Sequence, residues 1–366
     1  MAASYKWHPV TDLGSDPREL TEGELDSLRR VWENQKRELS GEGALDEFDK
    51  RLRREWAIET GIIEDVYTLD RGVTRTLIEK GIDAALIPHD ASNRDSALVA
   101  RIIQGHYDAL EGMFDFAGGQ RPLSTSYIKE LHVALLRNVD THEVVGQLGR
   151  RFEKPLEKGL YKTAPNSPTR PDGSIHEYCP QEHVASEMDQ LILMHRNHPE
   201  NTPPEVEAAW LHHRFTQIHP LADGNGRVAR ALASLVFIKA GWFPLIVKRE
   251  DRFRYVEALE RADHGDLRPL VSLFVEAQRN ALIQATEVAY DVTPVTSVDE
   301  AITAVRDRLL VRGKLPLREW LGAKDTAAQL LASAGQRLEQ IVRKLNQEIP
   351  SGRRTSLSTT RRLGYC

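Results

Sequence analysis

Apolar residues recur at helical spacing along most of this 366-residue chain, and the pattern predicts a protein built from helices. Two such patterns flank a short polar stretch, at Ala208, Leu211, Phe215 and Ile218 and again at Val228, Leu232, Leu235 and Val236. The sequence Thr202-Pro203-Pro204-Glu205 has the form of a capping box, so the first of these helices is expected over residues 205–218. Gly241 is a suitable end for the second helix.

The same periodicity extends to both sides of this pair. It predicts helices over residues 20–54 with a glycine break, 56–67, 73–80, 96–113, 124–138, 184–196, 267–286, 301–310 and 327–349. The fold class is therefore expected to be all-α. The last 16 residues are rich in Ser, Thr and Arg and are expected to be disordered, either as a solvated tail or as a contact for an acidic partner.

Residues 159–180 interrupt the helical pattern. Four prolines lie between positions 165 and 180, and Asp172-Gly173 is a turn signal, so no helix is expected here. We expect a short β-hairpin or an extended flap, and an ordinary surface loop is the alternative.

The polar stretch between the two central helices, His219-Pro220-Leu221-Ala222-Asp223-Gly224-Asn225-Gly226-Arg227-Val228-Ala229-Arg230, is expected to be a loop that opens the second helix. A helix start offers unpaired N–H groups and the positive end of the helix dipole. Glycines at 224 and 226 allow a ligand to approach the backbone closely. This combination predicts a site for an anion, and phosphate fits it well.

Four side chains of this stretch suit chemistry on a phosphate. Arg227 and Arg230 can bind phosphate oxygens, and Asp223 is the kind of ligand that holds Mg²⁺ together with phosphates. His219 is a base that is largely neutral near pH 7, and a nearby helix start should keep it so. The alternative is a capped turn with solvated arginines.

These residues resemble the Fic signature, H-P-F-x-D/E-G-N-G-R-x-x-R, with Leu221 in place of Phe as the one departure. The resemblance implies a mostly helical core with a hairpin flap, and transfer of AMP from ATP to a protein hydroxyl. It also implies a base at His219, a Mg²⁺ ligand at Asp223, a γ-phosphate contact at Arg230, and stabilisation of the reacting phosphate by Gly224, Asn225, Gly226 and Arg227. On this basis residues 121–290 are the Fic domain, 1–120 an N-terminal helical segment and 295–366 a C-terminal helical extension.

Two further segments fit the resemblance less closely. Thr60 and Glu64 match the inhibitory pattern [S/T]-x-x-x-E-[G/N] of Fic proteins, while Asp65 departs from it. The resemblance implies that Glu64 pairs with Arg230 and holds it away from ATP; the alternative is a solvated Glu on a helix surface. In residues 252–266, Tyr255 matches a residue at the edge of the family's adenine pocket, whereas the segment otherwise departs from the family pattern.

Composition excludes several other classes of protein. Apolar content is 40% and charged content 28%, as in ordinary globular proteins, and the net charge of −5 argues against a nucleic-acid-binding protein. The most apolar run, residues 231–247, contains a lysine, a glycine and a proline and is expected to be a buried helix, not a membrane span. The first residues lack the apolar core of a signal peptide, and the two cysteines form no metal-ligand spacing, so a cytoplasmic protein is expected.

The expected function is therefore a protein adenylyltransferase that uses ATP and Mg²⁺, modifies a Ser, Thr or Tyr hydroxyl of a target protein and of itself, and is restrained by Glu64. Two alternatives remain open. The same site could remove AMP or use another phosphorylated donor. The chain could instead be a nucleotide-responsive interaction protein without turnover. The sequence leaves the target and the oligomeric state open.

Overall fold

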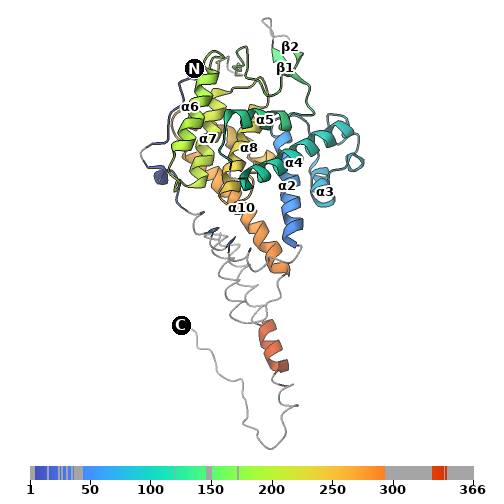
Figure 1. The fold of residues 1–366 in the computed structure, drawn as a ribbon. Coiled ribbons are helices and arrows are strands. Elements are labelled where there is room, and N and C mark those ends of the chain that lie inside the picture. The colour runs from blue at the N-terminus through green and yellow to red at the C-terminus, as the bar shows by residue number, and fades with distance from the viewer. Residues whose placement is uncertain are drawn as a thin grey trace, which may run out of the picture. The chain divides into compact units, whose positions relative to one another are not determined.

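In this computed structural model, residues 5–292 are described apart from 15, 24, 26–27, 30–31, 34–35, 37–43, 120, 146–150 and 171–172, together with 332–341 and 343. The described part is mostly helical (Figure 1). Its longer helices are α2 (Ala44–Ile62), α3 (Arg71–Lys80), α4 (Ser96–Gly118), α5 (Thr125–Leu135), α6 (Val184–Asn197), α7 (Pro204–Ile218), α8 (Asn225–Lys239), α9 (Arg252–Asp263) and α10 (Arg268–Val292). Short 3₁₀ turns lie at Pro17–Leu20, Ala84–Leu86 and Arg249–Asp251. The all-α prediction is confirmed.

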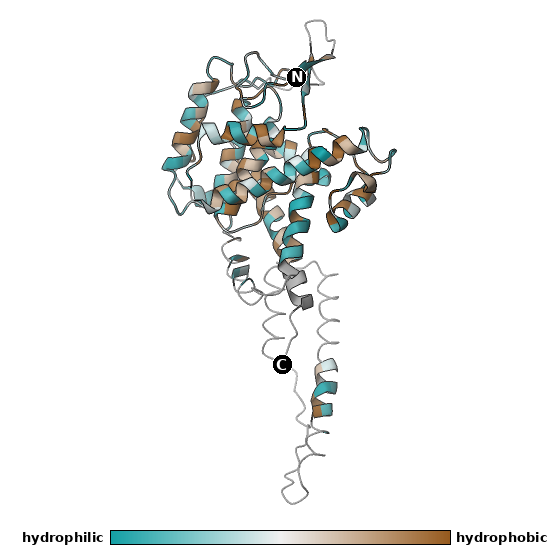
Figure 2. Cartoon of the chain, turned by 45° about the vertical axis from the view of Figure 1, so that its right-hand side comes forward, coloured by the Kyte–Doolittle hydropathy of each residue, from teal (hydrophilic) through white to brown (hydrophobic). Residues whose placement is uncertain are grey.

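The helices α7 and α8 form the centre of the fold and pack on each other more extensively than any other pair of elements described. Apolar side chains from both are fully buried, among them Phe215 and Leu232. Helices α2, α4, α5, α6, α9 and α10 surround them, and hydrophobic residues lie on the faces turned toward this centre (Figure 2). A helix that is buried on nearly all sides belongs to the interior of a domain, which makes α7 and α8 a rigid support for the loop between them.

Most predicted helices are found close to their expected bounds, with two differences. The segments predicted separately up to residue 54 and from residue 56 form one continuous helix, α2. The capping box predicted at residues 202–205 is wrong. Pro203 is the N-cap of α7 with no side-chain bond, and Glu205 accepts a hydrogen bond from the Thr21 hydroxyl (Oγ1–Oε1 2.7 Å) instead. The Glu205 carboxylate thus binds a residue that is distant in the sequence and does not cap the helix as the local motif would require.

The two-stranded sheet of the described chain lies before the segment in which a hairpin or flap was predicted, and it was not predicted itself. Strands β1 (Thr141–Val145) and β2 (Arg151–Pro155) pair antiparallel, with Val144 opposite Phe152. In the proline-rich segment, residues 159–180, the described residues form one bridge, between Thr169 and Ile175, and the Arg170 N–H donates to the Ser174 carbonyl at 2.8 Å, which agrees with the predicted short hairpin or flap. Prolines remove backbone donors, so a longer ladder cannot form there. The earlier strands were missed because their sequence is rich in charged residues.

The chain divides into two compact units, Met1–Thr293 and Pro294–Cys366. The division predicted near residue 120 stays a prediction. In the second unit, residues 332–341 and 343 are helical, as predicted. The helix expected at 301–310 and the tail lie outside the described residues. Within the described chain, no helix is long and apolar enough to cross a membrane.

Candidate functional site

His219 caps the C-terminal end of α7. Its backbone is left-handed (φ +51°), and its N–H still donates to the carbonyl of Phe215 at 2.9 Å. Its ring stacks on Tyr178, with centroids 3.8 Å apart and an angle of 7° between the planes. The ring nitrogen Nδ1 lies 3.3 Å from the carbonyl oxygen of Thr216. A proton on Nδ1 satisfies that carbonyl and leaves Nε2 as the basic nitrogen.

His219 is neutral, as predicted, although the reason differs. Burial, assisted by the ammonium group of Lys162, lowers the pKa of the imidazole to about 3. A helix start was expected to keep the ring neutral, but His219 lies at the end of α7, where the helix dipole favours a cation. Desolvation outweighs the dipole at this position.

The loop after His219 is stabilised by hydrogen bonds between its own residues. Asn225 is buried and clamps Leu221: its Oδ1 accepts from the Leu221 N–H at 2.9 Å, and its Nδ2 donates to the Leu221 carbonyl at 2.8 Å. Leu221 is fully buried, so the residue that departs from the Fic signature still anchors the loop. Gly224 is the N-cap of α8 with φ +77°, and a Cβ there would lie 2.7 Å from Leu136. Only glycine fits that position without strain.

Three side chains from outside the signature support the same loop. Asn166 donates to the carbonyl of Leu221 at 2.8 Å and accepts from the buried ammonium of Lys162 at 2.7 Å. Burial lowers the pKa of that lysine to about 8. His132 Nε2 lies 3.2 Å from the carbonyl oxygen of Asp223. The sequence analysis assigned none of these three side chains a role at the site.

Asp223 and Arg227 form an ion pair across one turn (Nη2–Oδ2 2.9 Å). The guanidinium of Arg227 is buried, yet its Nε and Nη1 find no hydrogen-bond partner in the described part of the chain. Buried donors without partners are costly, and an anion at the helix start would satisfy them. The Asp223 carboxylate is 39% exposed and available to a cation. One carboxylate beside a phosphate site is a donor set that fits Mg²⁺.

Arg230 binds the end of α2. Its Nη1 donates to Glu64 Oε1 at 2.6 Å, and its Nη2 donates to the carbonyl and the hydroxyl of Thr60 at 3.0 and 3.2 Å. Burial by itself would raise the pKa of Glu64, but Arg230 and Arg227 lower it below its ordinary value. A Cβ on Gly226 would meet Glu64 Oε1 at 2.2 Å, so the carboxylate lies directly against the first turn of α8. Glu64 therefore lies within the predicted anion site.

The backbone conformation at residue 65 explains why Asp can replace the Gly or Asn of the inhibitory pattern. It follows the end of α2 with a left-handed backbone, φ +53°, where Gly and Asn are the preferred residues and Asp is tolerated. Its carboxylate points to the other side and binds Arg252 through two hydrogen bonds of 3.0 and 2.5 Å. The turn that aims Glu64 thus forms with Asp in place of Gly or Asn.

Tyr255 is buried beside Arg230. Its hydroxyl lies 2.8 Å from His212 Nε2, and burial raises its pKa to about 12. The contact with the adenine ring stays a prediction. At the C-terminal end of α9, Asp263 bonds His213 (3.0 Å) and lies 3.7 Å from His176 of the proline-rich segment. Both His176 and Tyr178 were missed, because a sequence gives no measure of how an extended segment packs.

Comparison with known proteins identifies the family of the central region. The Fic/DOC family matches residues 122–237. A protein adenylyltransferase Fic from Nematostella vectensis is 36% identical over 119 residues, which are 32% of this chain and 26% of that protein. One from Culex quinquefasciatus is 31% identical over 123 residues, 33% of this chain and 23% of that protein. The chain thus spans about a quarter of the length of the curated relatives it matches.

Two solved structures share the fold. A Fic-domain-containing signaling protein from Bacteroides thetaiotaomicron has a TM-score of 0.58 and 22% identity, covering 73% of this chain and 98% of that one. Fic-1 from C. elegans has a TM-score of 0.55 and 23% identity, covering 74% of each chain. These two structures show that the described chain has the fold of Fic-domain proteins, and residues 122–237, which include the signature loop between α7 and α8, match the Fic/DOC family.

Proposed function

We propose that this chain is a protein adenylyltransferase that transfers AMP from ATP to a hydroxyl side chain of a target protein and of itself. The observation that carries the proposal is the convergence at the start of α8. A neutral imidazole, an accessible carboxylate and two buried guanidinium donors that have no partner among the described residues lie around one helix N-terminus. Proteins named for this activity are 36% and 31% identical to this chain over about a third of its length.

The reaction follows from the positions of these groups. His219 Nε2 takes the proton of the target hydroxyl, whose oxygen attacks the α-phosphate of ATP. The bond between the α-phosphate and the bridging oxygen breaks, and pyrophosphate leaves. The backbone at Gly224, Asn225 and Gly226 and the free donors of Arg227 stabilise the charge on the phosphate oxygens. Asp223 would hold Mg²⁺, which neutralises charge on the phosphates.

We further propose that Glu64 restrains this activity. Arg230 is the second arginine of the signature and the expected contact of the γ-phosphate. In the structure its guanidinium is engaged by Glu64 and Thr60, and the Glu64 carboxylate lies against Gly226. A nucleotide phosphate and this carboxylate would compete for the same donors. ATP would then bind in a misplaced position unless Glu64 moved.

A second reaction is compatible with the same contact. A carboxylate next to the phosphate site could orient a water molecule, and the site would then remove AMP from a modified protein. The position of Glu64 against the first turn of α8 is the observation that favours this alternative. The two directions respond oppositely to loss of Glu64: transfer should increase, whereas removal should fall.

The extended segment before α6 is proposed to hold the target. It carries the single bridge from Thr169 to Ile175 and places Tyr178 on His219. Exposed backbone of this kind can add a strand from another chain. At its far end the Glu177 N–H donates to the carbonyl of Tyr5, so the N-terminal segment takes one of the pairing positions.

The test is intact-mass analysis of the protein after incubation with ATP and Mg²⁺. Wild type, Glu64→Gly and the double variant Glu64→Gly/His219→Ala are compared. A mass increase of one AMP in Glu64→Gly that is absent from the double variant supports the proposal. The absence of AMP from Glu64→Gly and from proteins of a cell extract, at an ATP concentration that saturates binding, would refute it. Other nucleotide donors in parallel samples identify a different transferred group.

A further inference from the structure

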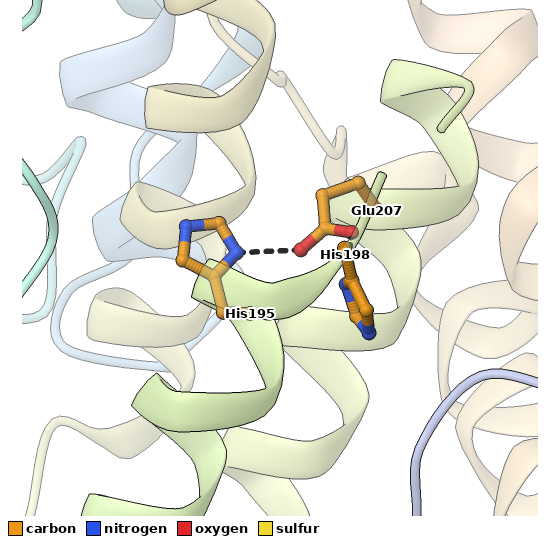
Figure 3. A group of neighbouring side chains, drawn as sticks. All are labelled: His195, His198 and Glu207. Carbon is orange, nitrogen blue, oxygen red and sulfur yellow. Dashed lines mark hydrogen bonds and ion pairs between the residues drawn. The ribbon is translucent and has the colours of Figure 1, made fainter. Parts of the chain in front are cut away.

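A second cluster of titratable side chains lies outside the Fic site. His195, His198 and Glu207 converge between α6 and α7 (Figure 3). Nδ1 of His195 lies 2.5 Å from one carboxylate oxygen of Glu207, and Nδ1 of His198 lies 2.5 Å from the other. The ligand atoms of all three residues lie within 4.8 Å of one another. Two imidazoles and one carboxylate form a donor set typical of a transition-metal site.

The local fold brings these residues together. His195 lies in the last turn of α6 and His198 is its C-cap, three residues on, so both rings project from the same end of the helix. Glu207 lies in the first turn of α7, directly after the connecting loop. The cluster is therefore built on two rigid elements. The sequence analysis missed it because the ligands come from different helices and match no compact motif.

A fourth residue orients the cluster from the N-terminal segment. Nε2 of His198 lies 2.6 Å from Oδ1 of Asp12. Metal-binding histidines commonly donate their second N–H to a carboxylate, which fixes the tautomer that leaves the first nitrogen as ligand. His198 has this arrangement, with Nε2 toward Asp12 and Nδ1 toward Glu207.

Hydrogen bonding alone is the alternative account of the cluster. Both histidines must then carry a proton on Nδ1, and His198 must carry another on Nε2, because each of these nitrogens faces a carboxylate oxygen. A divalent cation would replace the two Nδ1 protons and balance the charges of Glu207 and Asp12. Burial of Glu207, whose side chain is only 10% exposed, makes such compensation more important.

We propose that His195 Nδ1, His198 Nδ1 and Glu207 bind a divalent transition metal of the zinc class, with Asp12 as the outer partner of His198. Bonds of about 2.0–2.1 Å in a tetrahedral site separate ligand atoms by roughly 3.3 Å, so the 2.5 Å contacts need to widen by less than about 1 Å. The side chain of His195 is 21% exposed, which provides access from solvent and room for a water as fourth ligand.

This site is separate from the reaction. Glu207 precedes His219 by about 18 Å along α7, at 1.5 Å per residue. The metal would instead fasten the N-terminal segment to the domain. That segment already makes neutral and charged contacts nearby, since the Thr11 carbonyl accepts from Trp210 Nε1 at 3.0 Å and the Val10 N–H donates to Glu187 at 2.7 Å. The expected role is stabilisation.

The test uses the full chain, stripped with a chelator and desalted. It is titrated with Zn²⁺ in the presence of excess Mg²⁺, and bound metal is measured by elemental analysis after gel filtration. We expect one equivalent of Zn²⁺, a higher melting temperature, and with Co²⁺ an absorption spectrum typical of tetrahedral coordination. A chain that retains no stoichiometric Zn²⁺ shows that the cluster is held by hydrogen bonds alone and overturns the proposal.

Variants separate this site from others. His195→Ala, in a partly exposed position, should lose stoichiometric binding, and Asp12→Asn should weaken it about 10- to 100-fold, as is usual for an outer partner. His89→Ala, an exposed histidine outside the cluster, is the matched control and should bind as wild type does. Asp223→Ala should also retain Zn²⁺. Equal binding by wild type and a folded His195→Ala variant, judged by circular dichroism, would refute the assignment.

Discussion

Two regions meet at the start of α8 and are held there by different forces. The His219 loop, residues 219–226, is fixed mainly by neutral hydrogen bonds in the interior, such as the clamp between Asn225 and Leu221. The Glu64 turn, residues 60–65, is fixed by ion pairs, with Arg230 on one side and Arg252 on the other. Neutral buried bonds are indifferent to a charged ligand, whereas ion pairs can be exchanged for one.

The two arginines of α8 show the same contrast. Arg227, in the first turn of α8, pairs with Asp223 four residues before it, and two of its donors have no partner in the described part of the chain. Arg230 pairs with Glu64, which is 166 positions away in the sequence. The first arrangement is ready for a phosphate, while the second must be broken before Arg230 can reach one. We infer that the loop supplies the chemistry and the turn sets how often it is available.

The largest expected effect is on the loop. His219→Ala should lower AMP transfer by about 10²- to 10⁴-fold while ATP binding remains, because His219 acts as the base and not as a phosphate ligand. The rate is measured in the Glu64→Gly background. His219→Asn is the better-matched variant, since Asn tolerates the left-handed backbone found here. Transfer near the parent rate by either folded variant would remove His219 from this role.

Loss of the turn's carboxylate should have the next largest effect, in the opposite direction. A charge-assisted hydrogen bond contributes about 1.5–3 kcal/mol, so its removal should raise the fraction of competent sites by about one to two decades. Glu64→Gly should therefore increase self-modification by at least about tenfold. The melting temperature should fall by a few degrees, because this bond is also lost from the folded state, although Arg230 keeps its bonds to Thr60.

The control for this result is the arginine itself. Arg230→Ala also breaks the pair with Glu64, yet it should not raise activity, since it removes the expected contact with the γ-phosphate. A time course of AMP incorporation compares both variants with wild type. Equal rates for wild type and Glu64→Gly would contradict the restraint and leave the transferase proposal intact.

A smaller effect is expected at the carboxylate of the loop. Asp223→Ala should weaken nucleotide binding about tenfold or more when Mg²⁺ is present and little when it is absent, because one carboxylate with phosphates is a common Mg²⁺ site. Calorimetric titration of ATP with and without Mg²⁺ measures the difference. If the variant keeps the full enhancement by Mg²⁺, another residue holds the metal. Arg227 loses its partner in this variant and is free to bind phosphate.

The loop was predictable from the sequence and the turn only through the Fic resemblance. A contiguous signature between two helical patterns predicts a loop and a helix start, and α8 begins at Asn225 as that requires. The pairing of Glu64 with Arg230 depends on how α2 packs against α8, which no local pattern specifies. The same holds for Tyr178, which reaches His219 from a distant segment. A short motif predicts well the local structure of the residues that form it. Contacts between elements that are distant in the sequence can be identified only once the fold is known.

The electrostatic properties of the site were also only partly predictable from the sequence. The neutral state of His219 was predicted, but the helix dipole was given as its cause, whereas burial is the dominant effect. The proposed zinc site is a stronger case, since its ligands come from α6, α7 and the N-terminal segment. The burial of a side chain and the approach of distant side chains to one another are properties of the packed chain. A sequence indicates them only indirectly, through hydrophobic periodicity or a known motif.

The smallest expected effect is that of a substitution at Asp65. This substitution tests the contribution of the Asp65 carboxylate apart from that of Glu64. Its ion pair with Arg252 is exposed, with side chains 65% and 49% accessible, and such pairs contribute at most about 1 kcal/mol. Asp65→Gly removes the pair but suits the left-handed backbone, so stability and AMP incorporation should both change little, by less than about threefold in rate.

Asp65→Val is the sharper comparison at this position. A β-branched residue is strained at φ +53°, at a cost of about 1–2 kcal/mol, and relaxation of the turn would move Glu64 away from Arg230. Its AMP incorporation should therefore increase toward that of Glu64→Gly, with a lower melting temperature. If Asp65→Gly already equals Glu64→Gly in rate, the carboxylate of Asp65 takes part in the restraint. If both Asp65 variants behave as wild type does, the aim of Glu64 is set by the packing of α2 and not by this turn.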